Sequence, residues 1–123
     1  MNVISQVFAV VAGLFHVYAF VLESVLFRRP AVQRAFLGRT VASDVHLWAF
    51  NQGFYNLFLA AGAFGGVIAV HTGAAVAGRA VALFACACMM GAGVVLVVSD
   101  RTLWRGALGQ TVPPLVALLA ALA

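Results

Sequence analysis

The sequence predicts an all-α protein, specifically a polytopic membrane four-helix bundle whose fourth helix is short or bent at prolines. Two compositional features support this prediction. Hydrophobic residues make up 65% of the 123 residues and charged residues only 8%, whereas about a quarter of the residues of a soluble domain are charged. The few charges also leave long apolar stretches between them, and they could not cover a water-exposed surface. We therefore expect a single transmembrane domain over residues 1–123.

The first two helices are placed by the residues at their ends. The first is expected over about residues 3–27, because Arg28-Arg29-Pro30 combines two cations at a helix C-terminus with a helix breaker. The second is expected over about 45–70, with Ser43 and Asp44 as candidate N-caps. Between them, residues 28–44 mix polar and apolar side chains, and we expect an interfacial loop with one or two amphipathic turns.

The third helix is expected over about 74–99 and ends before Asp100-Arg101. The fourth is harder to place, because only nine residues follow Pro113-Pro114 and about 20 are needed to span a bilayer. It spans only if it begins near residue 104 and tolerates both prolines, so we expect it over about 104–123. Membrane helices do tolerate proline where neighbours satisfy the freed carbonyls.

The arginines predict how the chain lies in the membrane. Six of them fall in the loops after the first and third helices: Arg28, Arg29, Arg34, Arg39, Arg101 and Arg105. The opposite side has only Arg79. By the positive-inside rule the arginine-rich loops face the cytoplasm of a bacterial inner membrane, with both termini outside. Because the arginines flank apolar spans, we expect them to meet lipid headgroups and not nucleic acid.

Small residues in the second and third helices predict close packing between helices. They include Gly62-x-x-x-Gly66, Gly78, Gly91 and Gly93. Such residues let helix backbones approach one another in membranes. Packing within the bundle is the favoured interpretation, and dimerisation through the single Gly-x-x-x-Gly is the alternative.

Several polar side chains fall inside the expected spans, where lipid cannot satisfy them. His16 and Glu23 are seven residues apart on the first helix, hence on one face. The second helix carries a polar stripe in its cytoplasmic half: His46, Asn51, Gln52, Tyr55 and Asn56. Gln110 follows the third connection on the same side. We expect these groups to converge on a pocket open to the cytoplasm, and ionisable residues inside membranes are functional candidates by default.

Two stretches, His16-Val-Tyr-Ala-Phe-Val-Leu-Glu23 and Asn51-Gln-Gly-Phe-Tyr-Asn-Leu-Phe-Leu-Ala-Ala-Gly62, resemble the DUF1304 family of small bacterial membrane proteins. The resemblance extends over essentially the whole chain, including Gln110 before a proline-containing last helix. It implies four helices and marks the polar positions as characteristic of the family. The function of that family is unknown, so the resemblance implies no activity.

The polar set favours an enzyme that performs acid–base chemistry on a hydrophobic small molecule. A carboxyl in apolar surroundings can hold a proton at neutral pH, so Glu23 is the candidate general acid or base. His16 or His46 would relay the proton, and Tyr55 would stabilise charge. The remaining candidates would bind substrate: Asn51, Gln52, Asn56, His46 and Gln110. Isomerisation or cyclisation of an isoprenoid-like molecule fits and requires no cofactor.

Other interpretations remain open from the sequence. The polar groups could be interhelical hydrogen bonds in a structural or accessory subunit of a larger membrane complex. A small proton-coupled transporter of lipophilic compounds is a further alternative, and a dimer could supply its second gate. A metal site at His16, Glu23 and His46 is disfavoured because their spacing matches no established ligand pattern. The sequence does not choose between a homo-oligomer and a larger complex.

Overall fold

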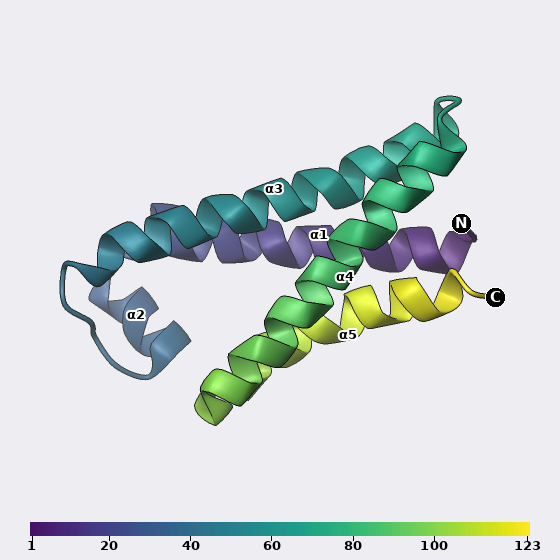
Figure 1. Ribbon diagram of the computed structural model, residues 1–123. Helices are drawn as coiled ribbons and strands as arrows, with labels where there is room; N and C mark the ends of the chain where they lie inside the picture. Colours follow the sequence, from purple (N-terminus) through teal and green to yellow (C-terminus); the bar gives the residue numbers. More distant parts are fainter.

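A computed structural model describes residues 1–123, and the chain is helical throughout with no strand. The elements are α1 (Val3–Phe20), the π-helical turn η1 (Val21–Val25), α2 (Pro30–Leu37), α3 (Val45–His71), α4 (Ala75–Ser99), the 3-10 turn η2 (Arg101–Leu103) and α5 (Trp104–Ala120). Figure 1 shows their arrangement. The all-α prediction is confirmed.

Three helices are long and apolar enough to cross a membrane: α1 continued by η1 with 23 residues, α3 with 27 and α4 with 25. They correspond to the first three helices expected from the sequence. Asn2 caps α1 by accepting a hydrogen bond of 2.9 Å from the Ser5 amide. Asp44 accepts from the Val45 amide at 3.1 Å and so caps α3, as predicted.

The last helix, α5, has 17 residues, which corresponds to a length of about 25 Å. It is short, as predicted, and ends at Ala120, before the expected end of the helix. The helix continues through Pro113 and Pro114, whose rings remove two amide donors from its middle. The carbonyls of Gly109 and Gln110 therefore lack their usual partners four residues along the helix.

The segment between the first two long helices contains about two helical turns, in agreement with the one or two turns expected. The eight-residue helix α2 begins at Pro30 and ends at Leu37, and its C-cap is Gly38, whose φ of 72° lies in the left-handed region. Proline suits the first position of a helix because its missing amide has no intrahelical partner there. Pro30 therefore starts α2, although its position after Arg28-Arg29 predicts only the end of the preceding helix.

The helices pack through small side chains. α1 contacts α3 and α5, and α4 contacts the same two helices (Figure 1). Fully buried residues of this core include Ala9, Ala12, Ala63, Cys86 and Met89. Large aliphatic and aromatic side chains on every long helix lie instead on the outer surface. Small residues inside and large apolar residues outside are typical of helices that pack within lipid.

Glycine allows the closest approach, which is between α3 and α4. A Cβ atom on Gly66 would lie 2.6 Å from the Ala82 amide nitrogen, and one on Gly78 would lie 2.7 Å from the Val70 nitrogen. Gly93 plays the same part against α5, where a Cβ would overlap Thr111. The predicted close packing is confirmed at these positions. Gly91, by contrast, has open space beside it.

The molecule has two distinct ends. Both termini lie at one end (Figure 1), where the Asn2 amide donates to the Ala120 carbonyl at 2.6 Å. The α3–α4 turn is tied to the same end, because His71 Nε2 donates to Gln6 Oε1 at 2.6 Å and Arg79 donates to the Ala121 carbonyl at 2.8 Å. The opposite end carries α2 and the start of α5, and it holds the candidate site.

Candidate functional site

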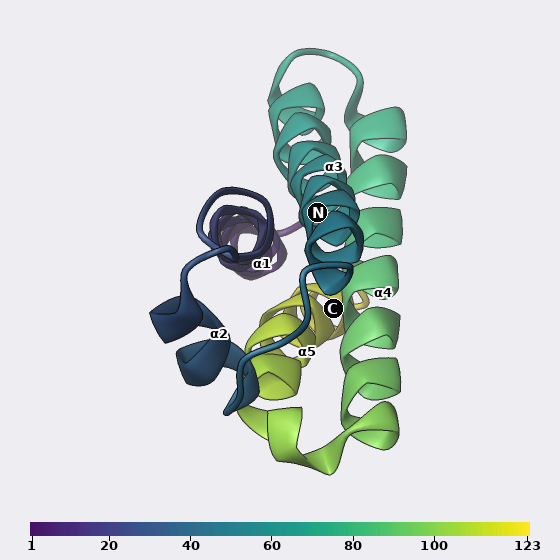
Figure 2. The ribbon, with the colours of Figure 1, turned by 90° about the vertical axis from the view of Figure 1, so that its left-hand side faces the viewer.

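A cavity of about 950 Å³ opens at the end of the molecule that carries α2. Its walls come from α1 with η1, α2, α3, the end of α4, η2 and the start of α5. Figure 2 shows α2 and the start of α5 facing each other at this end. Ligand pockets in proteins have volumes of about 300–1,000 Å³, so the cavity is large enough for a small organic molecule.

Glu23 lines the cavity from the middle of η1. In this turn the Leu26 amide bonds to the Val21 carbonyl at 2.9 Å, five residues back, so the turn holds one residue more than an α-helix would. The extra residue changes the direction in which the side chains after Val21 point. His16 and Glu23 therefore do not share the regular α-helical face that their spacing predicts.

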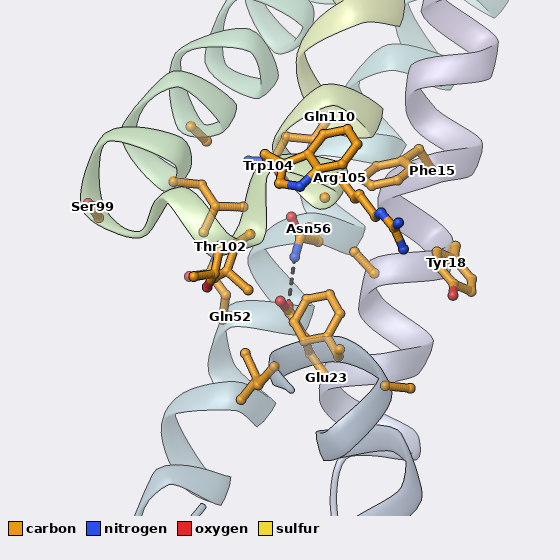
Figure 3. Close-up of a pocket in the computed structure, with 18 of the residues that line it drawn as sticks. Phe15, Tyr18, Glu23, Gln52, Asn56, Ser99, Thr102, Trp104, Arg105 and Gln110 are labelled. Carbon is orange, nitrogen blue, oxygen red and sulfur yellow. Dashed lines mark hydrogen bonds between the residues drawn. The ribbon is translucent and has the colours of Figure 1, made fainter. Parts of the chain in front are cut away.

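Asn56 holds the Glu23 carboxyl. Its Nδ2 donates to Glu23 Oε2 at 2.7 Å across the α1–α3 interface, as Figure 3 shows. Asn56 is buried, whereas Glu23 is half-buried. No protein hydrogen bond occupies Glu23 Oε1, which leaves this oxygen available to a molecule in the cavity.

Ser24 and Gly53 set the distance between η1 and α3. Ser24 Oγ donates to the Phe50 carbonyl at 2.8 Å, and a Cβ atom on Gly53 would overlap that hydroxyl. The glycine lets η1 sit against α3 at the level where Glu23 reaches Asn56. Sequence reasoning missed Ser24, because a linear pattern does not show that this residue packs against Gly53 of another helix.

The polar stripe of α3 splits between two sides of the helix. Gln52 and Asn56, one turn apart, line the cavity, and so does Gln110 from α5. Asn51 and Tyr55 do not line it; both are exposed, with 66% of the Tyr55 side chain accessible on the outer surface. The structure therefore brings together Glu23, Asn56, Gln52 and Gln110 and leaves Asn51 and Tyr55 apart from them.

The two histidines among the predicted residues also lie outside the cavity. His16 is fully buried, and its Nδ1 lies 2.9 Å from the Ala12 carbonyl. Because a carbonyl can only accept, Nδ1 carries the proton; Nε2 is buried with no partner. His46 instead accepts from Gln33 Nε2 at 3.1 Å.

Gln33 is a structural residue that sequence reasoning missed. It is only 3% exposed, and besides His46 it bonds the Phe27 carbonyl at 2.8 Å and the Val41 amide at 3.0 Å. These bonds tie α2 to the segments on both sides of it. A single glutamine in a segment of mixed polar and apolar residues carries no signal of burial, so Gln33 could not be selected from the sequence.

The cavity wall also contains two aromatic residues and two of the arginines that were expected to meet lipid headgroups. Arg34 and Phe36 come from α2. Trp104 and Arg105 come from α5, as Figure 3 shows. The Arg105 guanidinium lies 5.3 Å from the centre of the Trp104 ring, a cation–π contact. Glu23 is the one acidic residue in the wall, and no group of three His, Cys, Asp or Glu side chains is close enough to hold a metal ion.

Comparison with known protein families identifies the family of this chain. The model of the family described as "Protein of unknown function (DUF1304)" matches residues 10–122. The chain belongs to the DUF1304 family. The matched range of this DUF1304 protein includes every residue that lines the cavity. No curated protein and no solved structure matches the chain.

Proposed function

We propose that this DUF1304 protein is a membrane-embedded four-helix enzyme that performs cofactor-independent acid–base chemistry on a lipophilic, isoprenoid-like molecule. The observation that carries the proposal is the Glu23 carboxyl, which lines a cavity of about 950 Å³ and is bonded by one amide, that of Asn56. A single carboxyl in a largely apolar, ligand-sized cavity is a reasonable acid–base centre.

The orientation follows from charge. The end with the cavity carries Arg34 and Arg105, and the end with the termini carries Arg79. In the inner membrane of a bacterium the arginine-rich end faces the cytoplasm. The cavity then opens toward the cytoplasm, and both termini lie outside.

In the proposed reaction one carboxyl performs both proton transfers. For a double-bond isomerisation, Glu23 removes a proton from one carbon and returns it to another carbon of the same allylic unit, so no proton is gained or lost overall. The bond from Asn56 fixes the carboxyl, which leaves Oε1 as the reacting oxygen. Gln52 and Gln110 supply amides that bind a polar group of the substrate. His16 and Tyr55 lie outside the cavity and take no part in this scheme.

One observation favours a second candidate, a subunit of a membrane assembly. Asn51 and Tyr55 are polar groups on the outer face of α3, where lipid offers them no hydrogen bonds. A second copy of the chain or another membrane protein would satisfy them. This role and the enzymatic one are compatible, because Asn51 and Tyr55 do not line the cavity. A proton-coupled transporter uses the same cavity and carboxyl but moves its ligand chemically unchanged.

The test replaces the carboxyl and follows cellular lipids. Lipid extracts of cells that lack the protein are compared by mass spectrometry with extracts of cells that contain wild-type protein, Glu23→Gln or Asp44→Asn. Asp44 is a matched control, because it loses the same charge at a helix cap outside the cavity. We expect a lipophilic species to change its isomeric form with wild type and Asp44→Asn, and to remain unconverted with Glu23→Gln at equal protein levels. Full conversion by Glu23→Gln would exclude Glu23 as the acid–base group.

A further inference from the structure

Two arginines face the cavity without an acidic partner. Arg34 from α2 and Arg105 from α5 both line it, and the Glu23 carboxyl is bonded by Asn56 and by neither of them. The Trp104 ring supports one face of the Arg105 guanidinium. A guanidinium stacked in this way keeps its N–H edge free for bidentate bonds to phosphate or carboxylate oxygens.

The start of α5 adds to the positive potential. Trp104, Arg105 and Gly106, which form its first turn, all line the cavity. This turn contains no acidic residue, and no side chain caps it. The Asp100 carboxylate caps the η2 turn that leads into α5 and offsets part of the positive end of the helix dipole, so Arg34 and Arg105 supply most of the attraction for an anion at this wall.

The rest of the cavity is suited to an apolar chain. Phe15, Val95, Leu96 and Leu103 contribute to its wall. A second hollow of about 260 Å³, lined by apolar and aromatic residues alone, lies between α1 and α2 and shares Tyr18, Ala35 and Phe36 with the cavity: its lining is Tyr18, Leu22, Ala31, Val32, Ala35 and Phe36. The shared residues make it an apolar extension of the cavity toward the outer surface.

We propose that the cavity binds an amphiphile with an anionic headgroup, a phosphate or a carboxylate, and an apolar chain. Arg34 and Arg105 hold the headgroup, and the chain enters from the bilayer between α1 and α2, past Tyr18, Ala35 and Phe36. This inference rests on the proposed function in one respect, because it takes the cavity as the substrate site and names the class of substrate. Two arginines against one glutamate in the wall favour an anion over a cation.

The chain provides its own reporter for binding. It has two tryptophans; Trp104 lines the cavity, whereas Trp48 is 74% exposed on the outer surface of α3. In detergent-solubilised Trp48→Phe protein, fluorescence comes from Trp104 alone. Titration with dibromostearate, whose bromines quench tryptophan on contact, should give saturable quenching of Trp104. Dibromostearyl alcohol has the same chain without the charge and should quench at least about tenfold more weakly, the factor for one lost charge-assisted contact.

Variants locate the headgroup. In the Trp48→Phe background, Arg34→Gln and Arg105→Gln should each raise the apparent dissociation constant for dibromostearate by about tenfold. Arg28→Gln removes the same charge from a residue that does not line the cavity, and it should leave the constant unchanged. Trp104→Phe protein, in which Trp48 alone reports, should show only the non-saturable quenching that comes from amphiphile in the micelle.

Competition with dibromostearate distinguishes an amphiphile with an anionic headgroup from a free anion as the ligand. Oleyl phosphate should relieve the quenching, whereas inorganic phosphate should not, because the chain supplies much of the binding free energy. Relief by inorganic phosphate would identify a free anion as the ligand and overturn the proposal. Equal quenching by the alcohol, or equal constants for Arg34→Gln, Arg105→Gln and Arg28→Gln, would also overturn it.

The binding experiment and the acid–base test on Glu23 can fail independently of each other. Glu23→Gln should bind dibromostearate as tightly as wild type or more tightly, because the arginines hold the headgroup. If the anionic amphiphile binds but Glu23→Gln still converts the cellular lipid, the ligand class stands and the proposed chemistry fails. If Glu23→Gln abolishes conversion while the alcohol binds equally well, the chemistry stands and the ligand class fails.

Discussion

The three acidic residues of the chain occupy two kinds of environment. Asp44 caps α3 and Asp100 caps η2, each by accepting a bond from a nearby backbone amide in water-exposed surroundings. Glu23 alone reaches across a helix interface, where its partner is the Asn56 side chain. The two aspartates therefore serve local backbone geometry, and Glu23 is the acid whose surroundings suit chemistry.

Asp100 offers a pH-dependent test of the structure outside the membrane. The hydrogen bond from the Thr102 hydroxyl, 2.6 Å long, is the largest of the contributions that lower the pKa of Asp100 below its ordinary value of 3.8; the Thr102 amide and Arg39 add to it. Because the folded-state pKa is lowered, the stabilisation is present above the unfolded pKa and is lost as the pH falls through the folded one.

Removing the hydroxyl should therefore raise the pKa. We expect Thr102→Val to move the pKa of Asp100 up toward 3.8, and NMR titration of its carboxyl carbon measures the shift. Thr72→Val is the matched control, since the Thr72 hydroxyl bonds the Ile68 carbonyl of its own helix. An unchanged pKa in Thr102→Val would contradict the assigned hydrogen bond.

At single residues, the sequence predicted the polar site in part. Asn56 and Gln52 line the cavity, but Asn51 and Tyr55 face outward, because residues four apart form a stripe and the segment holds two stripes. Which stripe faces the protein depends on how α3 is rotated, and that is decided by packing partners such as Ser24 against Gly53. A linear pattern contains no information about that contact.

At the scale of elements, the α3–α4 contact depends on glycines with opposite surroundings. A Cβ atom on Gly66 would lie 2.6 Å from backbone, whereas one on Gly65 would meet nothing within 4 Å. We expect Gly66→Ala to force the helices apart and lower the free energy of unfolding by about 1–3 kcal/mol, the usual cost of overpacking.

Gly65→Ala provides the control for this prediction. It makes the same chemical change one residue away and should leave stability equal or slightly higher, because alanine favours helix more than glycine by up to about 1 kcal/mol. Unfolding of both variants in mixed micelles, followed by circular dichroism, measures the difference. Equal stability of the two variants would rule out the close approach.

Helix positions were largely predictable, but one local feature was not. Apolar length and end signals such as Asp44 placed the long helices well, since these signals are local. The π-helical turn at Val21–Val25 was not foreseen, whereas a last helix that includes Pro113 and Pro114 was expected and is present as α5. Both leave backbone groups without regular partners, and whether neighbouring helices tolerate this is a property of the tertiary structure.

For the whole molecule, the unequal number of arginines at its two ends predicts how it is oriented in the membrane. The α3–α4 turn and the termini share one end, and α2 lies at the other. In cells carrying a Cys86→Ala and Cys88→Ala background, Thr72→Cys should react with a membrane-impermeant maleimide added outside. Thr40→Cys, in the segment after α2, should react only after the membrane is opened. The reverse pattern would refute the cytoplasmic placement of the cavity.

In the proposed membrane-embedded four-helix arrangement, the shortness of α5 has a consequence for the surrounding lipid. Its 17 residues span about 25 Å, less than the hydrocarbon core of about 30 Å, while the 25 residues of α4 exceed it. Such hydrophobic mismatch is relieved by local thinning of the bilayer or by tilt. Thinning beside the first turn of α5 would draw headgroups inward to the level of Arg105. Bilayer thickness would then control how readily an amphiphile transfers from the membrane into the protein, and acyl-chain length would become a regulator of the site.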